Sequence, residues 1–371
     1  MPKPETLVIL SPGFPVNEAD STCLPPQQVF VRALKQAYPN LNIVVLAFEY
    51  PFAKASYQWF GVDVIAFGGK NRNKLFRLFN WIKIWQVLRK LNKQNNVIGL
   101  LSFWVDECAF IGHYFGKRYG TKHLSWILGQ DARPGNRYFK LIKPKAEQLI
   151  ALSDFVRNEV YKNYGIMPKH TITTGIDICL FGESPLKRDI DILGAGSLIA
   201  LKRYDVFIEA VKTIARYIPN VKAVICGKGP EREKLRRLIK QHGLGKNIVL
   251  RHELPHAEVL GLMQRSKVFL HTSEYEGFGA VLLEALYAGA QVVSFVKPMD
   301  KAVEHLHVVN NFEEMNARVF ELLLEKQLDH TPVLVYPIQQ VAIDMMSLFS
   351  QSDSATASIL AAMASDERVS L

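Results

Sequence analysis

Two glutamates, Glu276 and Glu284, stand eight positions apart in residues 272–295, TSEYEGFGAVLLEALYAGAQVVSF. Gly277 and Gly279 follow the first of them and allow the backbone to come close to a ligand. The helix predicted to begin there would turn its free N–H groups toward negative charge. At 1.5 Å per residue, the two carboxylates would lie roughly 10 Å apart. This separation suits a sugar nucleotide, with one acid at the ribose and the other at the sugar beyond the diphosphate.

A glycine turn ends the strand predicted at 190–195 and precedes Lys202. Gly196 would admit a phosphate to the backbone, and the Lys202 ammonium would neutralise charge on a departing diphosphate. A glycine turn after a strand is a weak signal, and a solvated surface lysine is the alternative. Gly227 marks a second turn of this kind after the next strand. His256, which follows a proline, is expected to be an exposed residue at a helix start.

The segment around Glu276 resembles the E-x7-E signature of retaining glycosyltransferases of the GT-B fold, particularly the large family 4. The resemblance implies that Glu284 binds the ribose hydroxyls. It also implies that Glu276, with the backbone near Gly277, Phe278 and Gly279, holds the donor sugar and its phosphate. Two glutamates at this spacing also occur by chance on many helices, but the surrounding EGFG, EAL and AG favour the family.

The resemblance covers most of residues 147–296 and implies further roles at the diphosphate. In the family, the strand at 190–195 ends in Gly-Arg, with a lysine five residues after the arginine. Lys202 matches that lysine, but Ser197 stands where the arginine is expected. The change removes a bidentate phosphate ligand, so Lys202 would carry more of the charge with help from Arg203. Lys202 and Glu276 are therefore expected to be catalytic, and the residues expected to bind the donor here are Gly196, Ser197, Arg203 and Gly227.

The first half of the chain matches the family more in the order of its elements than in its residues. Gly13 ends the first strand where family members carry a glycine-rich loop that touches the donor phosphate; an ordinary turn is an equal alternative. Many members place a histidine in the loop after the strand predicted at 123–128, but Leu128 takes its place here. Gln130 and Asp131 are then the polar groups expected to hold donor or acceptor hydroxyls. Capping of a helix or turn is the alternative for Asp131.

Short apolar β-branched runs alternate with helix-length segments, which predicts βα units around parallel sheets. Seven strands are predicted between residues 6 and 174, and five between 190 and 296. The expected α/β fold is the GT-B architecture of two doubly wound Rossmann-like domains with a ligand cleft between them. The acceptor-binding domain would span 1–182 and the nucleotide-sugar-binding domain 183–350. A tail or helix at 351–371 could pack back on the first domain.

The composition argues against a membrane-spanning protein, a secreted protein and a zinc- or disulfide-stabilised protein. The chain has 371 residues, of which 49% are hydrophobic, and no uncharged apolar run is long enough to cross a membrane. It enters its first strand without the apolar region of a signal peptide, so a cytoplasmic protein is expected. The four cysteines are isolated from one another, which predicts neither a zinc site nor disulfides. No metal or other cofactor is expected, because lysine and helix N-termini would hold the diphosphate.

Positive charge is concentrated in the first half of the chain. Residues 1–185 carry 23 Lys/Arg against 13 Asp/Glu, whereas residues 186–371 carry 22 of each. Such asymmetry predicts an acidic partner, and the chain shows no nucleic-acid-binding motif that would make this partner nucleic acid. Residues 70–94 hold eight Lys/Arg, no acid, and Phe76, Phe79, Trp81 and Trp85. They could lie on an anionic membrane surface; a core helix with a solvated basic edge is the alternative.

These observations together predict a retaining, metal-independent hexosyltransferase that moves a sugar from a nucleotide diphosphate sugar to a saccharide or lipid-linked acceptor. Bacterial surface glycan synthesis, at the inner face of the cytoplasmic membrane, is the expected setting. Two alternatives remain open from the sequence. A nucleotide-sugar 2-epimerase shares the architecture, although the EGFG motif argues against it. An inactive sugar-nucleotide-binding protein is consistent with the missing histidine and arginine.

Overall fold

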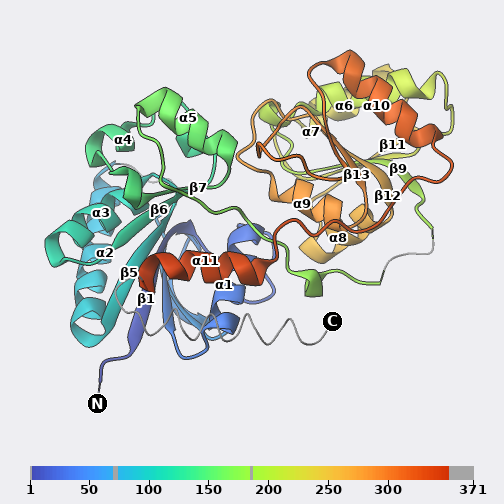
Figure 1. Cartoon of the computed structure of the whole chain (residues 1–371). Coiled ribbons are helices and arrows are strands. Elements are labelled where there is room, and N and C mark those ends of the chain that lie inside the picture. The colour runs from blue at the N-terminus through green and yellow to red at the C-terminus, as the bar shows by residue number, and fades with distance from the viewer. Residues whose placement is uncertain (1, 70–73, 184–186, 351–371) are drawn as a thin grey trace.

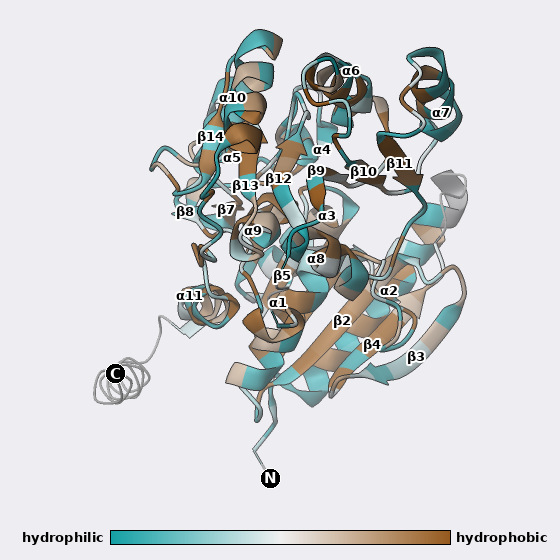
Figure 2. Cartoon of the chain, turned by 90° about the vertical axis from the view of Figure 1, so that its right-hand side faces the viewer, coloured by the Kyte–Doolittle hydropathy of each residue, from teal (hydrophilic) through white to brown (hydrophobic). Residues whose placement is uncertain are grey.

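The computed structural model describes residues 2–69, 74–183 and 187–350, without the side chains of 74–76. It contains two sheets, one in each half of the chain, with helices on both faces (Figure 1); all strands but the edge strand of the first sheet are parallel. This is the predicted α/β fold with two doubly wound domains. Figure 2 shows brown apolar strands in both sheets and teal polar surfaces on the outer helices, as expected when both faces of a parallel sheet are covered.

The first domain is built on an eight-stranded sheet in the order β3-β4-β2-β1-β5-β6-β7-β8. Its strands are β1 (Glu5–Gly13), β2 (Asn42–Tyr50), β3 (Lys54–Trp59), β4 (Val62–Phe67), β5 (Asn96–Phe103), β6 (His123–Ile127), β7 (Leu149–Ala151) and β8 (His170–Thr171). Its helices are α1 (Pro25–Ala37), α2 (Lys74–Gln94), α3 (Glu107–Tyr119), α4 (Arg137–Ile142) and α5 (Asp154–Tyr164). The central strands carry unbroken buried apolar runs at 7–10 and 43–48, which made them predictable. β3 is antiparallel and mostly exposed, so it lacks that apolar signal and was missed.

The second domain has a six-stranded sheet in the order β11-β10-β9-β12-β13-β14. Its strands are β9 (Ile190–Ala195), β10 (Ala223–Cys226), β11 (Ile248–Arg251), β12 (Ser266–His271), β13 (Gln291–Ser294) and β14 (Leu306–Val308). Its helices are α6 (Tyr204–Ala215), α7 (Arg232–Gln241), α8 (His256–Gln264), α9 (Ala280–Tyr287) and α10 (Phe312–Leu324). The four strands from β9 to β12 end at one edge of the sheet, where their loops face the first domain.

The last described helix, α11 (Ile338–Ser350), returns to the first domain and packs beside α1 (Figure 1). Its apolar residues belong to the same core cluster as β1 and β5. A Cβ atom on Gly99 of β5 would lie 2.2 Å from the Phe349 ring, so the glycine makes room for this helix. The predicted boundary, which assigned residues 183–350 to the second domain, therefore needs correction at its C-terminal end. Residues 351–371, predicted as a tail that could pack on the first domain, lie outside the described residues.

The two domains also meet across the cleft. Tyr275 Oη donates a hydrogen bond to Gly129 O at 3.0 Å, and Ser153 Oγ donates one to Gly277 O. A second contact joins the start of α5 to the loop after β13, where Asp300 N donates to Asp154 Oδ2 at 3.1 Å. These bonds hold the loops after β12 and β13 against the first domain. No helix among the described residues is long and apolar enough to cross a membrane.

Candidate active site

A cleft of about 350 Å³ lies where the carboxyl ends of the second sheet face the first domain. The second domain supplies the loops after β9, β10 and β11, the end of the loop after β12 and the first turn of α9. The first domain supplies Ser21, Thr22 and Pro25, at and just before the start of α1. Ligands of open α/β sheets bind at this edge.

Two glycine turns form the floor of the cleft. Gly196 has φ 147° and Gly227 has φ 159°, values that side-chain-bearing residues rarely adopt. A Cβ atom on Gly227 would lie 1.9 Å from Gly196 O, so the two turns touch through their backbones. Ser197 lines the cleft beside them. The structure thus brings together Gly196, Ser197 and Gly227, three of the residues that the sequence placed at the diphosphate.

Lys202 and Glu276, both of the second domain, form an ion pair in the cleft. Lys202 lies in the 3-10 turn before α6, and Thr272 Oγ1 donates to its carbonyl oxygen at 2.8 Å. His271 Nε2, at the end of β12, lies 3.6 Å from Glu276 Oε2. Burial alone would raise the pKa of Glu276, but His271 and Lys202 lower it to about 2. Glu276 is therefore a stable carboxylate, and a bound diphosphate would compete with it for the Lys202 ammonium.

His271 was not found by sequence analysis, although it occupies the last position of a strand that ends at the cleft. Its Nδ1 lies 3.0 Å from Ser294 Oγ on β13. Burial lowers the pKa of His271, and with the charge of Lys202 it outweighs the opposing effect of Glu276, so the imidazole is neutral at physiological pH. The position at the carboxyl end of a parallel strand was the available signal.

Glu284 lies behind the cleft wall, where it pairs with His256. The distance between His256 Nε2 and Glu284 Oε1 is 2.8 Å, and the two side chains are only 16% and 14% exposed. His256 lines the main cleft, whereas Glu284 lines a much smaller adjoining space. The prediction that His256 is exposed was wrong, because Pro255 and the start of α8 turn it inward toward α9.

Some residues of the EGFG motif line the cleft, and others contact the first domain. Gly279, with φ 75°, is the N-cap residue of α9 and lines the cleft. A Cβ atom on Gly277 would lie 2.6 Å from Leu128 O, so this glycine allows contact between the domains. Phe278 is 2% exposed and packs in the core of the first domain against Tyr336. Neither Gly277 nor Phe278 lines the cleft; both join the domains.

Two other predicted ligands point elsewhere. Arg203 pairs with Asp205 at 3.3 Å and with Glu274, and it lines a different cavity beside α6 and α10. Its charge is therefore paired with carboxylates outside the cleft that Lys202 and Glu276 line. Gly13 ends β1 against Tyr50, whose Cβ would lie 3.3 Å from an added Cβ. An ordinary turn, the alternative for Gly13, agrees with this packing.

The loop after β6 is organised by Asp131. This carboxylate accepts hydrogen bonds from Val105 N at 2.8 Å, Gly129 N at 3.0 Å and Leu128 N at 3.1 Å. Burial raises the pKa of Asp131 to about 6 against the effect of these amides. Asp131 thus holds two loops of the first domain together, which is the capping alternative. Gln130 is exposed and does not line the cleft.

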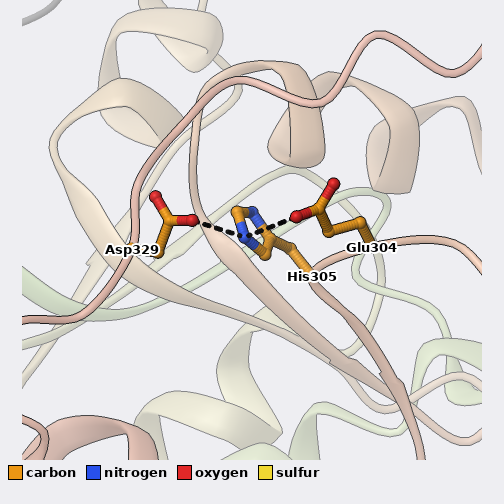
Figure 3. A group of neighbouring side chains, drawn as sticks. All are labelled: Glu304, His305 and Asp329. Atoms are coloured by element: carbon orange, nitrogen blue, oxygen red, sulfur yellow. Dashed lines mark ion pairs between the residues drawn. The ribbon is translucent and has the colours of Figure 1, made fainter.

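Figure 3 shows Glu304, His305 and Asp329, a group that could offer three metal-ligand atoms within 4.8 Å. His305 Nε2 lies 3.3 Å from Asp329 Oδ2 and 3.9 Å from Glu304 Oε1. A metal-binding imidazole normally donates its other N–H to an acceptor. Among the described residues His305 Nδ1 has no such partner. The group is therefore better described as an imidazole between two exposed carboxylates, and none of its members lines the cleft between the domains.

Residues 181–330 match the family model described as glycosyl transferases group 1. The match extends from β9 to α10 and includes every second-domain residue of the cleft. These residues form a group 1 glycosyltransferase domain. The family resemblance predicted from the sequence is thereby confirmed for the part of the chain that carries Glu276 and Glu284.

Curated relatives of this glycosyltransferase domain transfer sugars. A phosphatidylinositol N-acetylglucosaminyltransferase protein of Arabidopsis thaliana is 23% identical over 230 residues, which are 54% of this chain and 51% of that protein. The GtfA component of the UDP-N-acetylglucosamine–peptide N-acetylglucosaminyltransferase of Streptococcus pneumoniae is 30% identical over 226 residues. Those residues are 56% of this chain and 43% of that protein. The chain thus spans about half the length of these relatives or less.

Solved structures match nearly the whole chain. HepE of Anabaena, in complex with UDP and glucose, has a TM-score of 0.64 at 15% identity, covering 96% of this chain and 99% of that one. A sucrose-phosphate synthase of Thermosynechococcus elongatus has a TM-score of 0.66 at 15% identity, covering 94% and 98%. At these identities the likeness concerns the fold alone. It confirms the predicted GT-B architecture of two Rossmann-like domains.

Proposed function

We propose that the chain transfers a sugar from a uridine diphosphate sugar to a saccharide or lipid-linked acceptor, with retention of anomeric configuration. The observation that carries the proposal is the pairing of Lys202 with Glu276 beside two glycine turns and the first turn of α9. Helix N-termini and a lysine are suited to a diphosphate, and a fixed carboxylate is suited to sugar hydroxyls. Uridine is the proposed base because UDP is named with the pneumococcal relative and with the bound form of HepE.

The proposed reaction takes place on one face of the donor sugar. The acceptor hydroxyl oxygen bonds to the anomeric carbon while the bond from that carbon to the diphosphate breaks. The departing phosphate oxygen takes the acceptor proton, so a protein base is not required and the leucine at 128 is compatible with turnover. Lys202 and the amides at Gly279 and Ala280 stabilise the charge that develops on the diphosphate. On this proposal a divalent cation is not needed.

We propose that the first domain also rests on an anionic membrane that presents the acceptor. Exposed apolar side chains occur on α2, α3 and α4, which contact one another along one side of the domain (Figure 1). They are Leu78, Phe79 and Ile82 on α2, Tyr114 on α3 and Leu141 on α4. Exposed lysines at 117, 140 and 143 lie on or next to α3 and α4. Among proteins of this fold, WaaG is involved in lipopolysaccharide biosynthesis, and a surface glycan acceptor is proposed by that analogy.

A donor screen followed by turnover tests this function. The full chain should be stabilised by one or more UDP-sugars in a thermal-shift screen that includes GDP-sugars, by about 2.7 kcal/mol at a hundred times Kd. Lys202→Ala should then lower kcat by about 2–4 kcal/mol, the range for removing a preorganised charge-stabilising group. Lys228→Ala is the matched control, because this lysine lines the same cleft but is 76% exposed and pairs with Glu253. Its turnover should remain near that of the wild type.

The product and its dependence on metal distinguish the proposed function from its alternatives. NMR of the product should show the anomeric configuration of the donor, and excess EDTA should leave turnover intact. Loss of turnover in EDTA, restored by Mg²⁺ or Mn²⁺, would refute metal independence. Formation of an epimer without a glycoside would favour the epimerase. Donor binding without transfer to any acceptor would favour the inactive binding protein, and equal loss in both lysine variants would remove the role proposed for Lys202.

A further inference from the structure

Each carboxylate of the two-acid motif has its own basic partner from a separate element. Lys202, before α6, faces Glu276, and His256, at the start of α8, faces Glu284. A lysine keeps its charge throughout the physiological range, whereas a histidine can lose it. The two halves of the donor site are therefore balanced by groups that respond differently to pH.

His256 is firmly placed between the cleft and Glu284. It lines the main cleft and also the small space that holds Glu284. Its backbone N lies 3.4 Å from Ser21 Oγ of the first domain, so the start of α8 is anchored across the cleft. With its Nε2 2.8 Å from Glu284 Oε1, the imidazole determines which way this carboxylate points.

We propose that His256 is a positioning residue of the donor site: as an imidazolium it orients Glu284 for the ribose diol and offsets its negative charge near the diphosphate. This inference rests on the proposed function, because it assumes a nucleotide diphosphate in the cleft. A carboxylate offers about four acceptor positions, so one bond from His256 leaves enough for two ribose hydroxyls. Without the imidazolium, Glu284 would repel the anionic donor that it is meant to hold.

The surroundings of His256 favour its charged form. Burial by itself lowers the pKa of His256, but the hydrogen bond and the charge of Glu284 outweigh it and raise this pKa above its usual value. The other charged groups around the two spaces that His256 lines are Lys202, Lys228, Glu253, Glu276, Asp177 and, on its own helix, Glu258. Lys202 and Lys228 are paired with Glu276 and Glu253, which leaves Glu284 as the direct partner of the imidazole.

The consequence is a pH-dependent donor affinity. Below the raised pKa of His256 the imidazolium is present and the nucleotide binds well. As the pH rises through this pKa, the proton is lost, the bond to Glu284 becomes neutral and binding weakens. The loss should be about five- to tenfold, the difference between a charge-assisted and a neutral hydrogen bond.

Calorimetry with UDP between pH 6 and 9 tests the proposal in the full chain. Wild type should lose affinity over this range by the stated factor, and His256→Gln, which keeps a donor but not the charge, should have a flatter profile. Ionisation of the UDP phosphate affects both proteins equally, so their difference isolates His256. His113→Gln, a half-buried histidine of the first domain, is the matched control and should keep the wild-type profile.

A second nucleotide and a spectrum separate this role from simple support of the fold. Wild type should prefer UDP over 2′-deoxy-UDP, and Glu284→Gln and His256→Leu should each reduce that preference. The His256 resonance should titrate above pH 6.5 in wild type and lower in Glu284→Gln. Equal pH profiles of wild type and His256→Gln, or a titration unaffected by Glu284→Gln, would overturn the proposal while leaving the donor site intact. Failure of wild type to bind UDP at any pH would overturn the proposed function as well.

Discussion

At the scale of single residues, Glu276 shows how a carboxylate can be kept charged in a partly buried site. Its pKa falls from the usual value of 4.5 to about 2, since the effects of His271 and Lys202 exceed that of burial. A carboxylate whose pKa is lower in the folded than in the unfolded protein contributes its full stabilisation at pH values above the unfolded pKa. That stability is lost as the pH falls from 4.5 toward 2.

This linkage predicts a specific acid sensitivity. Glu276 should contribute roughly 3 kcal/mol at neutral pH, by the conversion of about 1.4 kcal/mol per pKa unit. Glu276→Gln should therefore be less stable than wild type at pH 7, with the difference shrinking at pH 3. Thermal unfolding of both proteins from pH 3 to 7 measures it, with Glu325→Gln, an exposed carboxylate, as control. A constant difference between wild type and Glu276→Gln across this range would contradict the assignment.

Asp131, unlike Glu276, is a carboxylate that supports the local backbone and does not line the cleft. Its type and place suggested a ligand for sugar hydroxyls, but three backbone amides occupy its oxygens. Its contribution to the site is indirect, because it shapes the loop in which Gly129 meets Gly277 of the second domain. A polar residue at a strand end can thus contribute to a site by fixing the conformation of a loop, without contacting a ligand itself.

At the scale of elements, α2 belongs to residues 70–94, which were predicted to lie on a membrane surface or to form a core helix with a solvated basic edge. Arg77 pairs with Glu107 at 3.0 Å, and Trp81 Nε1 donates to the same carboxylate, so one face packs on α3. Residues 70–73 and the side chains of Lys74 and Phe76, which belonged to the predicted membrane surface, lie outside the described structure. The exposed apolar group at Leu78, Phe79 and Ile82 is the better candidate for membrane contact.

We expect the full chain to sediment with vesicles that contain phosphatidylserine and much less with neutral vesicles. Basic residues near such a surface add about 1 kcal/mol each, and buried apolar groups add about 0.8 kcal/mol per CH₂. Replacing Leu78, Phe79 and Ile82 with serine should weaken this binding and leave UDP binding unchanged. Tyr217→Ser, at a 72% exposed aromatic residue of the second domain, is the matched control. Equal sedimentation with both vesicle types, or with neither, would rule out the membrane proposal.

At the scale of the whole molecule, the chain crosses between the domains twice. It leaves the first domain before β9 and returns to it with α11, whose apolar face completes the core around β1 and β5. Together with the contacts of Gly277 and Phe278, this return ties the loop after β12 to the first domain. The cleft geometry thus depends on both domains, although the cleft lining comes mostly from the second.

Phe349→Ala should reveal the contribution of α11 to the first domain. The ring is 6% exposed and rests against Gly99, so its removal should cost about 3–5 kcal/mol through lost burial and a cavity. Calorimetric unfolding should show a lower Tm for the first domain, whereas UDP affinity of the folded protein should stay close to wild type. Leu324→Ala, at a 58% exposed residue at the end of α10, should change neither quantity. An unchanged Tm in Phe349→Ala would mean that α11 does not support the domain.

The local order of residues was enough to predict the two α/β domains and to bring several of the proposed donor residues to one edge of a sheet. Strands, glycine turns and helix starts are specified by residues that are consecutive in the sequence. Gly196, Gly227, Lys202 and Glu276 could therefore be placed at one edge of a sheet. The exposed edge strand β3 escaped this reasoning because its burial pattern is weak.

Only the tertiary structure decided what each polar group binds. The pairing of His256 with Glu284, the capping role of Asp131, the outward turn of Arg203 and the return of α11 all depend on segments far apart in the chain. Hydrogen-bond partners, burial and the pKa shifts that follow from them are properties of packed neighbours, and no spacing along the sequence specifies them. The sequence by itself therefore determined which residues lie at the carboxyl ends of the strands, whereas packing determined which of their side chains remain free to line the cleft.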